Sequence, residues 1–190
     1  MRNGINPHFK VEKLIKVITK NTFFKPLKFV HFGTLINSKN NRRMKSIFTP
    51  EAHQEILNRI EQLNENAQPL WGKMTVGQMA NHCQPPINVM LQKKDYGLKP
   101  NWLVKTFFKK SMYNDKPWRK NMPTPARFQV KETKDFNNEK QELVSLINEL
   151  HTHKDKTNWQ PHPVFGDFTK DQWGQMQYKH LNHHLSQFGV

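Results

Sequence analysis

The sequence carries the same helix-start signal twice, a threonine followed three residues later by a glutamine. In "KMTVGQMANHC" the pair is Thr75 and Gln78, and in "DFTKDQWGQMQYKHL" it is Thr169 and Gln172. In such a capping box each of the two side chains accepts a hydrogen bond from a backbone N–H that has no partner within the helix. The sequence therefore predicts two helices with well-defined beginnings.

Apolar residues at helical spacing predict further helices. Residues 47–63 place Thr49 before a proline, the usual order of an N-cap and a first helical residue, and continue with an apolar stripe. Residues 137–151 show the same period, and residues 101–113 predict a shorter helix. No stretch alternates apolar and polar residues as a half-buried strand does. We expect an all-α domain over residues 44–190, a four-helix bundle with long loops.

The positive charge of the chain is the next constraint on function. The formal net charge of +15 raises nucleic-acid binding as a hypothesis. Residues 1–43 contain ten Lys and Arg against the single acidic residue Glu12, which gives +9, so residues 44–190 carry only +6. Since no dense cluster of Lys and Arg stands out in residues 44–190, we do not expect nucleic acid as the main partner.

Residues 1–43 form a basic N-terminal extension to this domain. Within it, "VEKLIKVITK" places apolar residues at helical spacing with lysines between them, which is typical of an amphipathic helix on a membrane surface. Two other interpretations stay open, a disordered and dispensable extension or a native start at Met44. If the protein contacts a membrane, we expect the contact through this segment only.

Cysteine usage and hydropathy indicate where the protein works. The single cysteine, Cys83, excludes an intramolecular disulfide framework and a cysteine-rich zinc site. The sequence shows no apolar run of membrane-spanning length and no signal peptide with a cleavage site. We therefore expect a soluble protein of the cytoplasm.

The closing segment, "QYKHLNHHLSQFGV", holds three of the ten histidines. His180 and His184 are four residues apart, so on a helix they lie on one face, one turn from each other, and can point at one ion. His183 is rotated by about 60° from the mean direction of this pair. The alternative is that the histidines form a solvated face or favourable charges near the helix C-terminus.

A pair of histidines needs a third ligand from another helix, because zinc sites usually have at least three protein ligands. His82 is the best candidate, since it lies about two turns after Thr75, at the edge of an apolar face. We therefore predict that His82, His180 and His184 bind a divalent ion, most readily zinc, with nickel as another imidazole-binding candidate.

Other catalytic arrangements find less support. The sequence has neither a glycine-rich phosphate loop nor a nucleophile elbow. His183 and Asp167 are the candidates for a general base, although Asp167 also suits a helix N-terminus. Gln78 could contact substrate one turn before His82, besides its capping role. Two prolines, at positions 85 and 86, are expected to bend or end this helix just past His82.

Four segments together resemble the DinB/YfiT-like superfamily of metal-dependent enzymes, and more narrowly an uncharacterised branch of it. They are "PLWGKMTVGQMANHCQ", "PWRKNMPTPARF", "HPVFGDFTKDQWGQM" and "YKHLNHHLSQFG". The resemblance implies an up-down-down-up four-helix bundle. It also implies a metal triad with one histidine from the second helix and an H-x-x-x-H pair from the last. The matching positions here are His82, His180 and His184.

The resemblance implies a metal-dependent hydrolase or a thiol-dependent transferase that acts on a small molecule, with a thiol as one candidate. Association into a homodimer through the bundle faces stays open. The alternative is a non-catalytic helical bundle that contacts nucleic acid or a membrane through basic surface. The side chains for this alternative would be Lys105, Lys109, Lys110, Arg119 and Lys120, with Trp102, Phe107 and Trp118 for stacking. They could equally belong to a solvated helix whose aromatic residues lie in the core.

Overall fold

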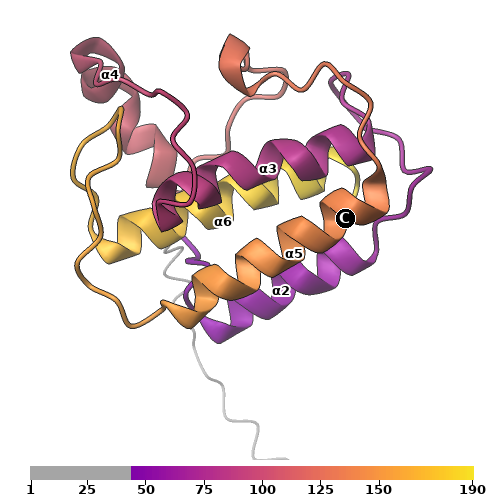
Figure 1. The fold of residues 1–190 in the computed structure, drawn as a ribbon, viewed down its shortest axis with the longest axis horizontal. Helices are drawn as coiled ribbons and strands as arrows, with labels where there is room; N and C mark the ends of the chain where they lie inside the picture. The colour runs from indigo at the N-terminus through magenta and orange to yellow at the C-terminus, as the bar shows by residue number, and fades with distance from the viewer. Residues whose placement is uncertain (1–43) are drawn as a thin grey trace, which may run out of the picture. The chain divides into compact units, whose positions relative to one another are not determined.

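The structure, a computed structural model, describes residues 44–190, and this part of the chain is helical (Figure 1). Its elements are α2 (Pro50–Glu61), α3 (Val76–Leu91), α4 (Trp102–Tyr113), a short 3-10 helix η2 (Ala126–Phe128), α5 (Phe136–Thr152) and α6 (Lys170–Gln187). Residues 44–190 contain no strand, only an isolated bridge between His162 and Gly166. The all-α class is therefore confirmed for this part of the chain, whereas the predictions for residues 1–43 lie outside it.

The helices begin where the sequence predicted. Thr75 accepts from the backbone N–H of Gln78 at 3.2 Å, and the Gln78 side chain accepts from the N–H of Thr75 at 3.0 Å. Thr169 and Gln172 form the same box at 3.2 and 3.1 Å. Thr49 caps α2 through a first-turn N–H at 3.3 Å. These caps fix the residues at which α3 and α6 begin, and these two helices carry the histidines of interest.

The prolines of α3 do not end the helix as expected, since it continues through Pro85 and Pro86 to Leu91. Each proline removes one hydrogen bond to the carbonyl four residues earlier. Contacts with α5 and α6 outweigh this loss. One such contact is the side-chain amide of Gln84, which donates to the Glu139 carboxylate of α5 at 2.7 Å.

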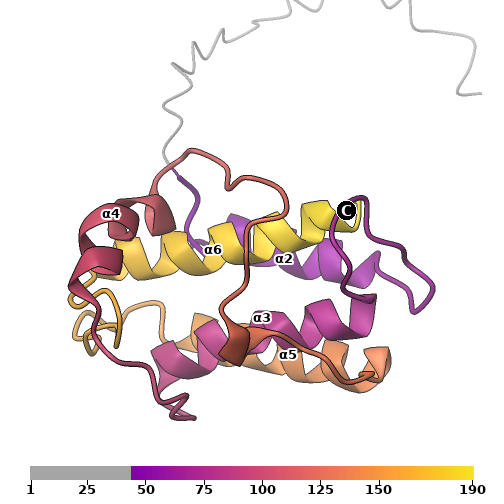
Figure 2. The ribbon, with the colours of Figure 1, turned by 90° about the horizontal axis from the view of Figure 1, so that it is seen from above.

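Four of the helices surround a common core, and α4 lies at one end of this group (Figures 1 and 2). Helix α3 packs against α5 and α6, α2 packs against the same two helices, and α4 packs mainly against α6. The largest fully buried side chains include Ile56, Ile87, Ile147, Trp173 and Leu181. None of the helices in residues 44–190 combines the length and the apolar composition that a membrane span needs. The packing of α3 on α6 places His82 opposite the C-terminal half of α6.

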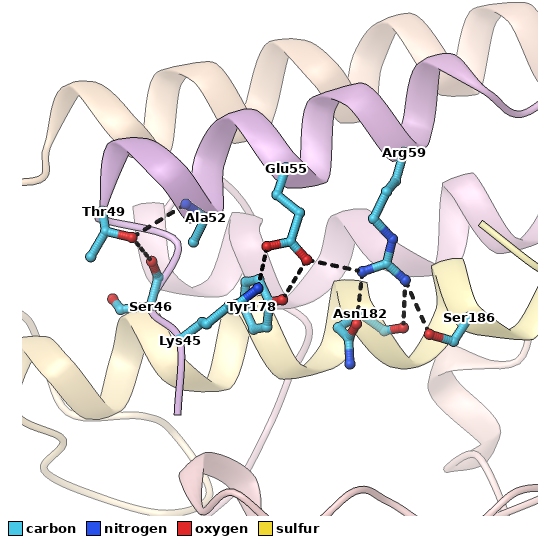
Figure 3. A network of polar contacts seen from close by, with 9 residues as sticks. All are labelled: Lys45, Ser46, Thr49, Ala52, Glu55, Arg59, Tyr178, Asn182 and Ser186. Carbon is cyan, nitrogen blue, oxygen red and sulfur yellow. Dashed lines mark hydrogen bonds and ion pairs between the residues drawn. The ribbon is translucent and has the colours of Figure 1, made fainter. Parts of the chain in front are cut away.

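Arg59 of α2 fixes the C-terminal end of α6 (Figure 3). One of its amino groups donates to the Asn182 side chain at 2.7 Å. The other donates to the Ser186 hydroxyl at 3.0 Å and to the carbonyl of Val190 at 2.7 Å. Since a helix end leaves its last carbonyls without partners and carries partial negative charge, a guanidinium there is favourable.

Glu55 extends this network one turn earlier on α2 (Figure 3). Its carboxylate lies 3.7 Å from the Arg59 guanidinium and accepts from the Tyr178 hydroxyl of α6 at 2.8 Å. Lys45 donates to the same carboxylate at 2.6 Å. The network therefore ties α2 to the part of α6 that spans residues 178–186, where two of the candidate ligands lie.

Replacement of Arg59 by methionine, which keeps an unbranched apolar stem, should remove these contacts to the end of α6. We expect a loss of about 1.5–3 kcal/mol in the free energy of unfolding, the range for hydrogen bonds to charged groups. Urea unfolding followed by circular dichroism measures the change, with exposed Arg119→Met as the matched control. Equal stability of the two variants would contradict this role of Arg59.

Candidate metal centre

The structure brings together the three histidines that the spacing selected. The ring centroids of His82 and His184 are 4.7 Å apart, those of His180 and His184 are 4.8 Å apart, and those of His82 and His180 are 5.2 Å apart. One potential ligand atom from each residue lies within 4.8 Å of the other two, and all three residues are buried. Within residues 44–190 this cluster could hold a metal ion.

Hydrogen bonds fix the orientation of two of these rings. Nδ1 of His82 lies 3.0 Å from the carbonyl oxygen of Phe128, which can only accept, so this nitrogen carries the proton. Nδ1 of His184 lies 3.0 Å from the side-chain oxygen of Gln187, whose amide in turn donates to the carbonyl of Trp71 at 2.6 Å. Both rings therefore keep an unprotonated Nε2. Metal-binding histidines are commonly oriented by such partners.

His180 makes a different set of contacts. Its Nε2 lies 3.4 Å from Nε2 of His82, and its Nδ1 is buried without a hydrogen-bond partner in the described structure. Two nitrogens bound to one tetrahedral zinc ion lie about 3.3 Å apart, so the Nε2 pair fits a shared ion. The wider separations within the cluster require small ring rotations to close around one ion.

The same 3.4 Å distance also fits a metal-free cluster, in which His180 donates a long hydrogen bond to His82. In that arrangement the three histidines would only pack. It would give the unprotonated Nε2 of His82 a donor, but it would leave unexplained why the ring of His184 is also held with Nε2 unprotonated. The hydrogen bonds of His82 and His184 therefore favour the metal site.

The electrostatic environment keeps the cluster neutral. Burial lowers the pKa of His184 to about 3, with repulsion from His82 as a second cause. Burial also lowers the pKa of His180 well below its ordinary value, again with a contribution from the neighbouring histidines. For His82, burial outweighs the opposing effect of the bond to the Phe128 carbonyl, and the pKa is lowered. Neutral imidazole is the form that binds metal ions.

An open pocket of about 520 Å³ reaches the cluster at His184. Its lining comes from residues 71–78, from the loop of residues 121–131 and from the end of α6. Lys73 and Lys131 line it, and its lining residues include no aspartate or glutamate. A small molecule can therefore approach His184 through a pocket that carries positive charge.

Of the two candidates for a general base, only His183 lies at this site. Its ring centroid is 5.1 Å from that of His184, and it lines the pocket. Burial lowers its pKa, and positive charge on His82 or Lys179 would lower it further. Asp167 lies before the start of α6, about 20 Å from His180 at 1.5 Å per residue, so it cannot serve this site.

Gln78 and Cys83 take structural roles. Both polar atoms of the Gln78 side chain are engaged, one with Thr75 in the capping box and one with the carbonyl of Glu132 at 3.1 Å. Gln78 nevertheless lines the pocket. Cys83 is buried with its sulfur 3.7 Å from that of Met79, and burial raises the pKa of its thiol, so it is not placed as a ligand.

The chain after α4 covers His180, a feature that the sequence did not predict. The ring of Trp118 lies 5.9 Å from that of His180, and its indole N–H donates to the carbonyl of Ser111 at 2.9 Å. Lys179 donates to the same carbonyl at 2.7 Å and to the Asn114 side chain at 2.7 Å. Burial lowers the pKa of Lys179 to about 8. Trp118 is thus turned toward the histidines rather than outward for base stacking.

Comparison with known proteins gives one family. A family model described as "Protein of unknown function (DUF1569)" matches residues 41–189, which include all three histidines of the cluster. No curated protein and no solved structure matches the chain significantly.

Gln187 offers a test of the metal centre that leaves the three histidines in place. Gln187→Leu removes the acceptor that orients His184, so we expect about 10–100-fold weaker zinc binding. Gln187→Glu keeps an acceptor at this position and should retain most of the affinity. Isothermal titration calorimetry measures both. Equal affinities in the wild type and Gln187→Leu would show that this hydrogen bond does not support metal binding.

Proposed function

The chain belongs to the DUF1569 family, and we propose that it is a metal-dependent enzyme with a three-histidine site. His82, His180 and His184 would hold one divalent ion. The observation that carries this proposal is the orientation of His82 and His184 by Phe128 and Gln187, which leaves both Nε2 atoms unprotonated in a buried cluster.

Zinc is the proposed ion, with nickel as the second candidate, because neutral imidazoles suit both metals. An ion held by three imidazoles would supply a Lewis acid that lowers the pKa of water or of a thiol and polarises an acceptor group. The neutral state of the three histidines is consistent with this use, since protons would not compete for their nitrogens at pH 7.

The reaction proposed for this site is hydrolysis or transfer to a thiol. The substrate would enter through the pocket at His184, where Lys73 and Lys131 favour a molecule with an anionic group. His183, neutral and beside His184, would take the proton from the O–H of water or from the S–H of a thiol. Trp118 would keep water away from His180 on the other side.

The proposed fold is the four-helix bundle of the DinB-like type. In support, α2 and α3 each contact both α5 and α6, so the four long helices form a closed set of contacts. The ligands come from the second and the last of these four helices, α3 and α6, as they do in the superfamily that the sequence resembles.

Metal content measures the central part of the proposal. Purified, tag-free protein incubated with zinc and freed of excess metal should retain about one ion per chain by elemental analysis. The variants His82→Ala, His180→Ala and His184→Ala should each lose it, while the exposed control His153→Ala should retain it. Circular dichroism checks that the variants remain folded. A wild type that retains neither zinc nor nickel would contradict the site.

Activity assays separate the two proposed reactions. We would test p-nitrophenyl esters and phosphates for hydrolysis, and glutathione with an electrophilic acceptor for thiol transfer. A reaction at this site should require the metal and fall about 100-fold or more in His183→Ala. A base must be unprotonated, and burial lowers the pKa of His183, so the rate should decline only at a pH below the range in which a free histidine titrates. An unchanged rate in His183→Ala would exclude this residue as the base.

A further inference from the structure

The positive charge of residues 44–190 is concentrated in one segment. Residues 96–131, which contain α4 and the loop after it, hold nine Lys and Arg against the single acidic residue Asp115, a formal charge of +8. The remainder of residues 44–190 has 11 basic and 13 acidic residues, a formal charge of −2. The structure thus places nearly all of the excess charge on α4 and the adjoining loop.

The same segment exposes most of the large apolar side chains on the surface. These exposed residues are Leu70, Trp102, Leu103, Phe107, Phe108 and Met122, and all except Leu70 lie in residues 96–131. Trp102 and Phe107 are 72% and 71% exposed. Single exposed apolar residues are common, but a cluster of this kind marks an interaction surface.

Helix α4 arranges three of these apolar side chains and one lysine on one face. Trp102, Leu103, Phe107 and Lys110 lie within about 140° of one another around the helix axis and are all exposed. The half-buried Val104 lies outside this range, at about 200° from Trp102. No residue of α4 is fully buried, and in Figure 1 the helix lies at one end of the group formed by the others. We call Trp102, Leu103, Phe107 and Lys110 the α4 face.

We propose that the α4 face binds the surface of an anionic lipid bilayer. Its combination of Trp, Phe and Leu with Lys110, on a segment rich in Lys and Arg, matches helices that lie in the membrane interface, with the aromatic rings among the headgroups and the basic groups near anionic lipids. The charge of residues 96–131 is complementary to such a surface. This function is independent of the metal site. It lies on a different segment from residues 1–43, where an amphipathic membrane helix was one of three interpretations of the sequence.

Nucleic acid fits the α4 face less well. Contacts to a nucleic-acid backbone come from polar and charged groups, and they would leave Leu103 exposed to water. Several basic residues of the segment are already engaged within the protein, since Lys109 donates to the Asp167 carbonyl and Arg127 donates to the carbonyls of Tyr96 and Gly97. Trp118, which could have stacked on a base, lies against His180.

Sedimentation with lipid vesicles tests the proposal on the full chain. Wild-type protein should bind vesicles of phosphatidylcholine and phosphatidylglycerol at least tenfold better than vesicles of phosphatidylcholine alone. The preference should weaken when salt is raised from about 0.1 M to about 0.5 M, because the interaction is partly electrostatic. Failure of the wild type to bind anionic vesicles would overturn the proposal, and so would tight binding to a single-stranded oligonucleotide without binding to vesicles.

Variants locate the interaction on α4. Trp102→Ser with Phe107→Ser should lower vesicle binding at least tenfold, whereas Leu70→Ser, at an exposed apolar residue outside the segment, should not. Lys105→Glu with Lys110→Glu should have the same effect, whereas Lys154→Glu, outside the segment, should have little. All of these residues are exposed, and circular dichroism verifies the fold. Undiminished binding by either double variant would place the contact elsewhere in the chain and overturn the proposal.

Discussion

The burial of three imidazoles between α3 and α6 is the constraint on which the other features depend. Polar rings inside a protein need partners, or their desolvation is a net cost to stability. His82 and His184 each use one nitrogen on a fixed acceptor and keep the other unprotonated. The ring nitrogens of His180 have a polar contact only with His82, through Nε2, and Nδ1 has no hydrogen-bond partner in the described structure. A divalent ion would bind the nitrogens of the three rings that face one another, since neutral imidazoles are good ligands for it.

The long connections between the helices serve this cluster. The loop before α5 provides the carbonyl of Phe128 to His82, and the segment before α3 provides the carbonyl of Trp71 to Gln187. The chain after α4 lays Trp118 over His180. Arg59, from α2, holds the end of α6. Two long connections, residues 62–75 and 114–135, therefore position or cover parts of the same site, and the pocket opens where they meet α6.

The sequence predicted the features that depend on local geometry. Capping residues such as Thr75 fix where a helix begins, and the spacing of His180 and His184 fixes their common face. It could not predict Phe128 or Gln187 as partners, because a carbonyl in a loop and an amide one turn away have no distinguishing pattern. The prolines at positions 85 and 86 did not end α3, because tertiary packing outweighed the lost hydrogen bonds. Asp167 was a wrong candidate that the spacing could have excluded, because the residues between it and His180 span about 20 Å of helix.

The most direct measurement is X-ray absorption spectroscopy at the zinc edge on the zinc-loaded, full-length protein. We predict three imidazole nitrogens at about 2.0–2.1 Å from the zinc ion, with oxygen or nitrogen atoms in the remaining position or positions. The multiple-scattering pattern of imidazole should be present. A first shell of oxygen atoms without imidazole scattering, or a sulfur ligand from Cys83, would contradict the three-histidine site.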